Sequence, residues 1–155
     1  AVGLIRSQET FARVVAAATL SETGSVADAA ARRVIHWFFK EAREAGIGAV
    51  ILALARASVI DHSSSCSSLW DAQVNCAHAL IEGYLCHYAE IVAPTPLLRG
   101  QDLLALGVPP GRSVGRAAAF LAEAQAAGEV ATTAQAHALV QQWLEQDNCT
   151  KGRAA

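Results

Sequence analysis

Apolar residues recur at steps of three and four along every long segment of this 155-residue chain. Such steps place side chains on one face of an α-helix. No segment alternates apolar and polar residues for long enough to indicate a β-strand, and only 4 prolines and 11 glycines interrupt the many Ala, Leu and charged helix formers. The pattern therefore predicts an all-α helical bundle, whose core draws on a composition that is 53% hydrophobic.

Start and stop signals divide the chain into separate helices. Ser25 with Asp28, and Thr132 with Gln135, have the spacing of capping boxes. The run over residues 49–60 is nearly continuous in apolar residues, so we expect a buried helix there. The expected helices span residues 6–18, 26–45, 49–60, 68–90, 101–106, 113–127 and 132 onward, with Gly46, Gly107 and Gly128 as stops.

Three of the expected helices carry apolar stripes. The helix over residues 68–90 has one stripe, and the last two helices have stripes that should face each other in a small bundle. We interpret Trp37, Trp70 and Trp143 as core residues rather than stacking platforms. The first stripe contains Trp70, Val74, Ala77, Ile81, Tyr84 and Tyr88, and the facing pair places Val114, Ala117, Ala118, Leu121 and Ala124 against Ala136, Leu139, Val140, Trp143 and Leu144.

The segment Pro94-Thr95-Pro96 interrupts the helical pattern. Proline lacks the backbone N–H and biases the residue before it toward extended conformations, so no helix continues through this segment. We interpret it as the boundary between two units. The predicted organisation is a helical region over residues 1–92, a small C-terminal helical domain over 93–147 and a disordered end over 148–155.

Charge is distributed unevenly although its total is only -2. Residues 1–60 contain seven basic and five acidic side chains, residues 61–98 contain four acidic and no basic ones, and residues 99–155 contain five of each. The total excludes a strong overall attraction to nucleic acid, so any such contact must be local. The acidic middle segment is the wrong place to expect phosphate contacts.

Location is predicted from the absence of targeting features. No apolar stretch reaches the roughly 18 residues that a membrane span needs, and the four cysteines contain no closely spaced pair. We therefore expect a soluble protein of the reducing cytoplasm that does not enter the membrane. The chain begins with Ala-Val-Gly-Leu-Ile-Arg, without Met or a signal peptide, and we interpret it as a cut from a longer chain.

Motifs of a self-sufficient enzyme are missing from the sequence. We find no phosphate-binding Gly-rich loop, no carboxylate pair for magnesium ions and no close cysteine pair for zinc. Cys76 and Cys86 are ten residues apart, which separates them by roughly 80° around a helix, and cysteine is a common core residue. We expect no zinc, although the nearest approach to a metal cluster contains His62, Cys66, Cys76, His78, Cys86 and His87.

One region carries a recognisable family pattern. Residues 97–115 read Leu-Leu-Arg-Gly-Gln-Asp-Leu-Leu-Ala-Leu-Gly-Val-Pro-Pro-Gly-Arg-Ser-Val-Gly, and residues 123–130 read Glu-Ala-Gln-Ala-Ala-Gly-Glu-Val before the capping Thr132. This segment of about fifty residues resembles the C-terminal helical region of bacterial tRNA nucleotidyltransferases and poly(A) polymerases. Arg112 stands where the family pattern has a proline in the turn, which frees the backbone and adds a charge.

A second segment extends the resemblance upstream. Residues 37–46, Trp-Phe-Phe-Lys-Glu-Ala-Arg-Glu-Ala-Gly, and residues 52–55, Leu-Ala-Leu-Ala, are similar to the last helices of the His-Asp (HD) type domain of a subgroup of this family, the type that includes CCA-adding enzymes. Arg56 occupies the position at which that domain has a metal-binding Asp. The earlier His and Asp ligands are not in the chain, so we do not expect metal-dependent phosphohydrolase activity.

The resemblance implies a function for the fragment. The family transfers nucleotides from CTP or ATP to an RNA 3′ end, using two Mg²⁺ ions held by carboxylates of an N-terminal head. That head is missing here, and its N-terminal domains are implied partners from the same parent chain. The C-terminal helices grip the acceptor stem and elbow of tRNA, so we expect a chain without catalytic residues that positions tRNA or other structured RNA.

The expected RNA contact lies around the turn before residue 113. Arg112, Ser113 and Arg116 fall within about one helical turn, where free N–H groups and the helix dipole favour a phosphate. Such contacts read backbone shape with little base recognition. The alternative for the two arginines is a solvated helix end. Arg99, and further along Lys151 and Arg153, would extend this patch.

Four neighbouring residues are better explained by structure than by chemistry. Gly107 closes the short helix, and Gly111 supplies the unusual dihedrals of the turn. Gly115 is expected to allow close packing of two helices. Asp102 is expected to cap the short helix.

Two other functions stay open at this point. A helical interaction or dimerisation module without RNA binding is favoured by the weak net charge and by the long stripe from Trp70 to Tyr88, and a homodimer is its expected partner. A self-sufficient metal hydrolase comes third. The sequence leaves undecided whether the parent adds CCA, CC, A or poly(A), because that choice belongs to the missing head.

Overall fold

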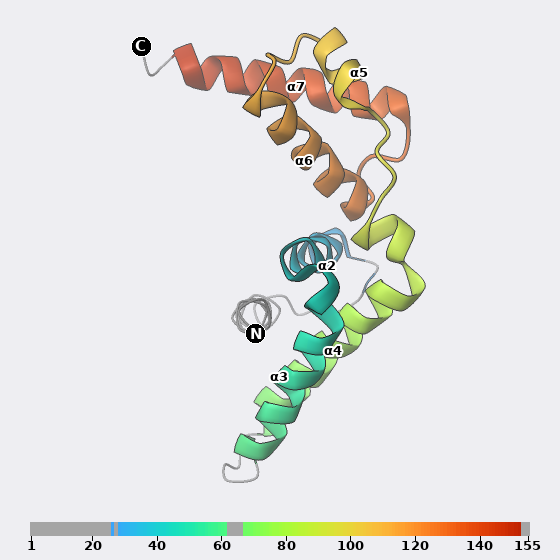
Figure 1. The fold of residues 1–155 in the computed structure, drawn as a ribbon, viewed down its shortest axis with the longest axis vertical. Helices are drawn as coiled ribbons and strands as arrows, with labels where there is room; N and C mark the ends of the chain where they lie inside the picture. Colours follow the sequence, from blue (N-terminus) through green and yellow to red (C-terminus); the bar gives the residue numbers. More distant parts are fainter. Residues whose placement is uncertain (1–25, 27, 62–66, 153–155) are drawn as a thin grey trace.

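The computed structural model describes Val26 and residues 28–61 and 67–152. This part of the chain is helical and contains no strand, so the all-α prediction is confirmed. The helix expected over residues 6–18 lies outside the described residues. In chain order the elements are α2 (Ala29–Ala42), the 3₁₀ turn η1 (Arg43–Ala45), α3 (Gly46–Asp61), α4 (Ser67–Cys86), the π-type turn η2 (Tyr88–Val92), α5 (Gly100–Ala105), α6 (Arg112–Ala127) and α7 (Thr133–Gly152) (Figure 1).

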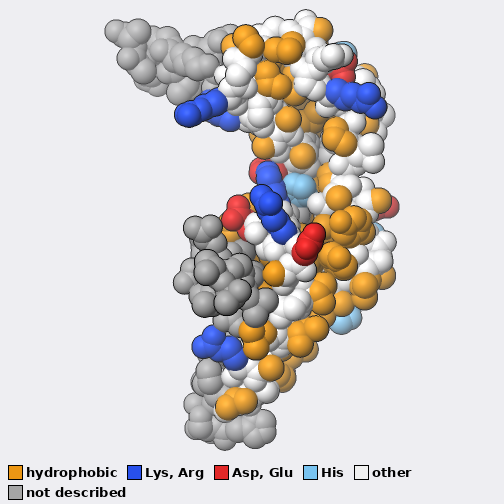
Figure 2. Space-filling model, viewed as in Figure 1, with side chains coloured by type: hydrophobic (Ala, Val, Ile, Leu, Met, Phe, Trp, Pro, Cys, Tyr) orange, Lys and Arg blue, Asp and Glu red, His pale blue; other side chains and the backbone are white. Residues whose placement is uncertain are grey.

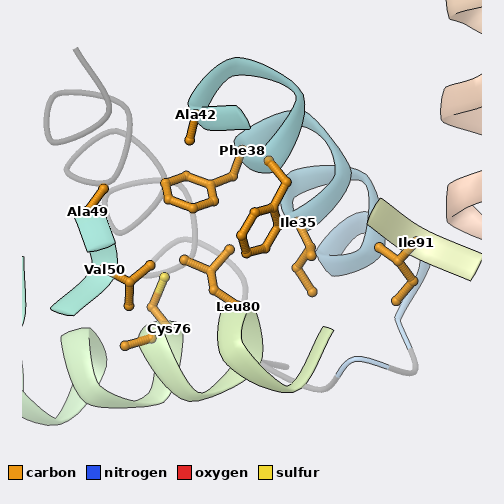
Figure 3. Close-up of a cluster of buried hydrophobic side chains, with 10 residues drawn as sticks. Ile35, Phe38, Ala42, Ala49, Val50, Cys76, Leu80 and Ile91 are labelled. Carbon is orange, nitrogen blue, oxygen red and sulfur yellow. The ribbon is translucent and has the colours of Figure 1, made fainter. Parts of the chain in front are cut away.

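The first hydrophobic cluster joins α2, α3 and α4. Phe38 from α2 and Leu80 from α4 are almost fully buried, and Leu80 lies among Phe38, Val50 and Cys76 in Figure 3. Phe39 adds ring contacts, with its centroid 5.1 Å from that of Phe38. The buried members are Ile35, Phe38, Phe39, Ala42, Ala49, Val50, Cys76, Ala77, Leu80 and Ile91.

The start and end of α2 differ from the expected signals. Asp28 is itself the N-cap residue and makes no side-chain capping bond, so the helix begins later than expected, and Ser25 of the predicted box lies outside the described residues. The helix ends at Ala42 rather than at Gly46, because Arg43 adopts a left-handed φ of 50°. Gly46 instead begins α3. A Cβ atom on Gly46 would lie 2.6 Å from Cδ1 of Phe39, so a side chain is excluded there by packing.

This corner of the fold yields a matched prediction on two glycines of α3. Gly46→Ala forces a methyl group against the buried Phe39 ring and should lower the free energy of unfolding by about 1–3 kcal/mol. Gly48→Ala meets open space and should raise it by roughly 0.4–1 kcal/mol, because alanine restricts the unfolded chain. Urea denaturation followed by circular dichroism measures both. Two shifts of the same sign would contradict the packing described here.

Helices α3 and α4 are less buried than the sequence suggested. The expectation of a buried helix over residues 49–60 is wrong, because Ile51 is 59% and Val59 is 77% exposed. The stripe expected on α4 is confirmed in part, because Ala77 is buried and Ile81 and Tyr84 pack against the first cluster, whereas Val74 and Tyr88 are exposed. The buried face contains Cys76 and Leu80, which lie toward α2 and α3. Helix α4 also ends at Cys86, four residues before the expected Glu90, and η2 follows it.

The second hydrophobic cluster joins α5, α6 and α7, with Leu103, Leu121 and Val140 almost fully buried. The predicted box at the start of α7 is confirmed, because Thr132 Oγ1 accepts the Gln135 N–H and Gln135 Oε1 accepts the Thr132 N–H. α7 runs to Gly152, so helix covers part of the range expected to be disordered. The buried members are Leu98, Leu103, Val108, Ala117, Leu121, Ala124, Val130, Ala136 and Val140.

The two clusters lie on either side of residues 93–96 and are linked by α2 packing against α6. Figure 1 shows α6 lying above α2, with the long α3–α4 pair extending away from the junction. Ala118 is exposed and belongs to neither cluster, so its predicted place opposite α7 is wrong. None of the described helices is both long and apolar enough to cross a membrane.

Candidate nucleic-acid interface

The start of α6 is open to solvent. Gly111 is its N-cap residue, with φ of 102°, and supplies no side chain to bond the first N–H groups. Arg112 occupies the first helical position and is exposed, and Ser113 beside it is half-buried. No ion pair engages Arg112 among the described residues. A phosphate at this end would meet backbone donors, the positive helix dipole and a guanidinium group.

Arg116 lies one turn further along α6 and is held against α7. Its guanidinium carbon is 5.7 Å from the centroid of the Trp143 ring, a cation–π distance. Trp143 is half-buried against the second cluster, in agreement with its predicted core role, and its ring also supports this arginine. The pairing keeps the charge of Arg116 at the surface and restricts its side chain. Sequence reasoning did not find this contact, because the two residues are 27 positions apart.

The C-terminal helical unit over residues 93–147, which contains α5 and α6 and most of α7, is called the tail below. The backbone of Arg99 lies in it at the start of α5, next to the start of α6. A Cβ on Gly100 would lie 3.7 Å from Cγ1 of Val114, which places the start of α5 against the first turn of α6. The Arg99 N–H donates to Oδ2 of Asp102 at 2.7 Å. The arginine side chain has no acceptor, so only this half of a capping box forms. Asp102 therefore caps α5 and also places a carboxylate beside Arg99.

The remaining residues of the expected patch have separate positions. Gly107 has a φ of 93°, which favours glycine after α5. A Cβ on Gly115 would meet open space, so the expected close helix packing at Gly115 is wrong. The backbone of Lys151 lies in the last turn of α7, and Arg153 lies outside the described residues. The structure thus brings Arg112, Ser113 and Arg116 together along the first turns of α6, and it places the backbone of Arg99 at the adjacent start of α5.

The family-like segment over residues 124–129 forms the junction between α6 and α2. Gln125 accepts the Leu97 N–H and donates to the Thr95 carbonyl, which ties the linker to α6. Its neighbour Ala126 accepts a hydrogen bond at 2.9 Å from Nε of Arg32. Glu129 pairs with Arg33 at 2.6 Å. These are structural contacts, and the sequence had identified the two arginines only as part of a basic N-terminal segment.

His36 ties α2 to η2. Its Nδ1 lies 2.7 Å from the carbonyl oxygen of Ile91. A carbonyl oxygen only accepts hydrogen bonds, so Nδ1 is the donor in this contact. This Nε2 is buried and has no hydrogen-bond partner among the described residues. An unpartnered buried polar atom in a native fold calls for a physical explanation.

Metal-ligating side chains do not gather in the described part of the chain. No group of three or more His, Cys, Asp or Glu residues there could hold a metal ion. His62 and Cys66 of the cluster considered above lie outside the described residues. Cys76 belongs to the first hydrophobic cluster, and Cys86 is exposed. The expectation of no zinc stays a prediction.

Cys76 and Cys86 should differ in reactivity. Burial raises the pKa of the Cys76 thiol from 9.0 to about 11, because the core disfavours the thiolate. Folding thus favours the protonated thiol, and this stabilising contribution is present below pH 9 and is lost as the pH rises through 11. At pH 8 iodoacetamide should alkylate Cys86 and leave Cys76 intact, as read by peptide mass spectrometry. Equal modification of the folded protein would contradict the buried position of Cys76.

The fold and the charged helix start define an all-α chain with a candidate phosphate-binding end. Among curated proteins, the A-adding tRNA nucleotidyltransferase of Deinococcus radiodurans is 51% identical over 55 residues. The match covers 35% of this chain and only 13% of that enzyme. No family model matches the chain, and no solved structure matches it. The partial relative supports the resemblance at the level of the family, and the HD-type subgroup and the C-terminal placement stay predictions.

Proposed function

We propose that this chain is a non-catalytic tRNA-binding region of a tRNA nucleotidyltransferase or poly(A) polymerase. In this role it positions the RNA acceptor end for nucleotide addition by N-terminal domains. The observation that carries the proposal is the uncapped start of α6, with exposed Arg112 in its first turn and the Trp143-supported Arg116 one turn further along. The partial likeness to an A-adding tRNA nucleotidyltransferase supports RNA as the anion.

The chemistry of this end suits a phosphate backbone. Two neighbouring phosphates of an A-form stem could be met by the helix N-terminus and by the flat guanidinium groups, without contact to base edges. Asp102 limits the positive charge near Arg99 and should repel misplaced phosphates. Binding is therefore expected to depend on the shape of a folded RNA, and the affinity is expected to fall as the salt concentration rises.

The reaction belongs to the proposed parent. Mg²⁺ and CTP or ATP would bind to its N-terminal head, which would add nucleotides while the present chain holds the RNA. A cytoplasmic location goes with this role. Whether that parent adds A, CC, CCA or poly(A) would follow from the head.

Binding of fluorescently labelled tRNA, measured by anisotropy between 20 and 300 mM KCl (roughly the range over which phosphate contacts are screened), tests the proposal. Affinity should fall steeply with salt, and Arg112→Gln should reduce the salt slope by about 1. Arg33→Gln removes the same charge from a residue already paired with Glu129 and is the matched control. The absence of salt-dependent binding at low ionic strength would overturn the proposal.

A helical dimerisation module is the second candidate, because large apolar side chains are exposed on α3 and α4. Ile51 and Val59 on α3 and Leu85 on α4 are 59%, 77% and 71% exposed. Figure 2 shows hydrophobic side chains along this part of the molecule. Analytical ultracentrifugation distinguishes the candidates, because a strictly monomeric chain that binds tRNA supports only the first.

A further inference from the structure

A cavity of about 560 Å³ opens where the linker crosses between α2 and α6. Its size falls in the roughly 300–1,000 Å³ range of small-ligand sites. Figure 2 shows Lys or Arg, Asp or Glu, and His side chains gathered in the narrow middle part of the molecule, between its two helical clusters. The side chains that matter for its chemistry are His36, Phe39, Lys40, Arg43, Tyr84 and Tyr88.

One side of the cavity is aromatic. The Tyr84 centroid lies 5.0 Å from that of Phe39 and 5.2 Å from that of Tyr88, so the three rings form a continuous contact series. Tyr88 is 48% exposed, which leaves much of its ring uncovered. Across from these rings α6 contributes only alanines, Ala118, Ala119 and Ala122. A small-residue wall and an exposed ring together leave room for a planar ligand.

The other side carries charged side chains. Lys40 and Arg43 line the cavity together with a single carboxylate, Glu44. Lys40 is only loosely engaged, with Nζ 3.7 Å from Oε1 of Glu123 and both side chains about half exposed. Exposed pairs of this kind contribute little, so Lys40 can exchange this partner for a phosphate at small cost.

Two further features of the cavity wall are energetically unfavourable for the folded chain by itself. Arg43 holds a positive φ of 50°, which disfavours any residue with a Cβ and is concentrated at ligand sites in proteins. His36 lines the same cavity, and its buried Nε2 has no partner among the described residues.

We propose that this cavity binds one unpaired nucleotide of the RNA, with the base stacked on Tyr88 and the phosphate held by Lys40 and Arg43. The inference rests on the proposed function and adds a second contact, separate from the phosphate grip at the start of α6. Stacking tolerates any base, so the site should prefer single-stranded over paired nucleotides rather than one sequence. It would anchor a splayed nucleotide at the junction of the two helical clusters.

Binding of a fluorescently labelled four-nucleotide single-stranded RNA and of AMP to the whole chain tests the site. Tyr88→Leu removes the ring and should weaken both by about tenfold, within the range for loss of one stacked base. Tyr88→Phe keeps the ring and should bind as the original chain does, which separates stacking from an effect on folding. Lys40→Gln should weaken AMP more than adenosine, because only AMP carries the phosphate.

A blunt-ended RNA duplex, in which every nucleotide is paired, distinguishes this site from the phosphate contacts at the start of α6. Its affinity should fall with Arg112→Gln and stay within twofold with Tyr88→Leu. If tRNA binds and responds to Arg112→Gln, yet neither AMP nor the oligonucleotide responds to Tyr88→Leu, the cavity inference is overturned and the proposed function stands. If tRNA does not bind but AMP binding depends on Tyr88, the proposed function fails and the nucleotide site stands.

Discussion

Leu80→Ala is expected to lower the free energy of unfolding by about 2–5 kcal/mol. Leu80 is 1% exposed and lies between Phe38 and Cys76 in the first cluster (Figure 3). Truncation removes its burial and leaves a cavity that the rings around it cannot fill. Because small domains are stable by roughly 5–15 kcal/mol, this loss would bring the chain close to unfolding at room temperature. Chemical denaturation followed by circular dichroism measures it.

Leu85→Ala is the matched control, on the same helix and with the same change in side chain. Leu85 is 71% exposed, so its truncation should change the free energy of unfolding by no more than about 0.5 kcal/mol. Equal losses for the two variants would mean that Leu85 is covered in solution. That outcome would contradict the exposed face of α4 and favour the dimerisation candidate.

Arg32→Ala should cost about 1–3 kcal/mol, because it leaves the Ala126 carbonyl without its side-chain donor. Nε of Arg32 lies 2.9 Å from that oxygen in a partly buried position, and the side chain is 22% exposed. Its second contact, to Glu90 at 3.5 Å, joins α2 to η2. The loss should appear as weakened docking of α6 on α2, and hydrogen exchange of both helices measures it.

Arg33→Ala provides the comparison at the neighbouring residue. Arg33 reaches Glu129 at the shorter distance of 2.6 Å, but the two side chains are 51% and 46% exposed. Solvent screens such a pair, so we expect a cost below about 1 kcal/mol. A larger loss of stability for Arg33→Ala than for Arg32→Ala would contradict the view that the partly buried hydrogen bond from Arg32 to the Ala126 carbonyl is the main polar contact between α2 and α6.

The junction changes how the family-like segment is understood. From sequence, Gln125 and Glu129 helped to identify the resemblance but had no role of their own. In the structure, Gln125 binds the linker and Glu129 pairs with α2. These two residues of the pattern therefore attach the tail to the linker and to α2. The candidate RNA contacts at Arg112 and Arg116 lie toward the opposite end of α6.

The ends of the tail helices were predictable because their signals are local. Thr132 with Gln135 bonds as a capping box, and Gly128 ends α6 with a φ of 80°, as the sequence indicated. The placement of Arg112 and Ser113 at the start of α6 follows from the same kind of signal. Backbone bonds over three or four residues decide these features, so no distant contact is needed to predict them.

The chain's own sequence determined that it is all-α, where most tail helices begin and end, and that a proline segment separates two hydrophobic clusters. Only the tertiary structure decided which faces of α3 and α4 are buried, because both helices are apolar on several sides and their partners choose the face. It also brought Arg116 to Trp143 and Arg32 to Ala126. Those contacts join residues far apart in the chain, and helical periodicity carries no information about which helices meet.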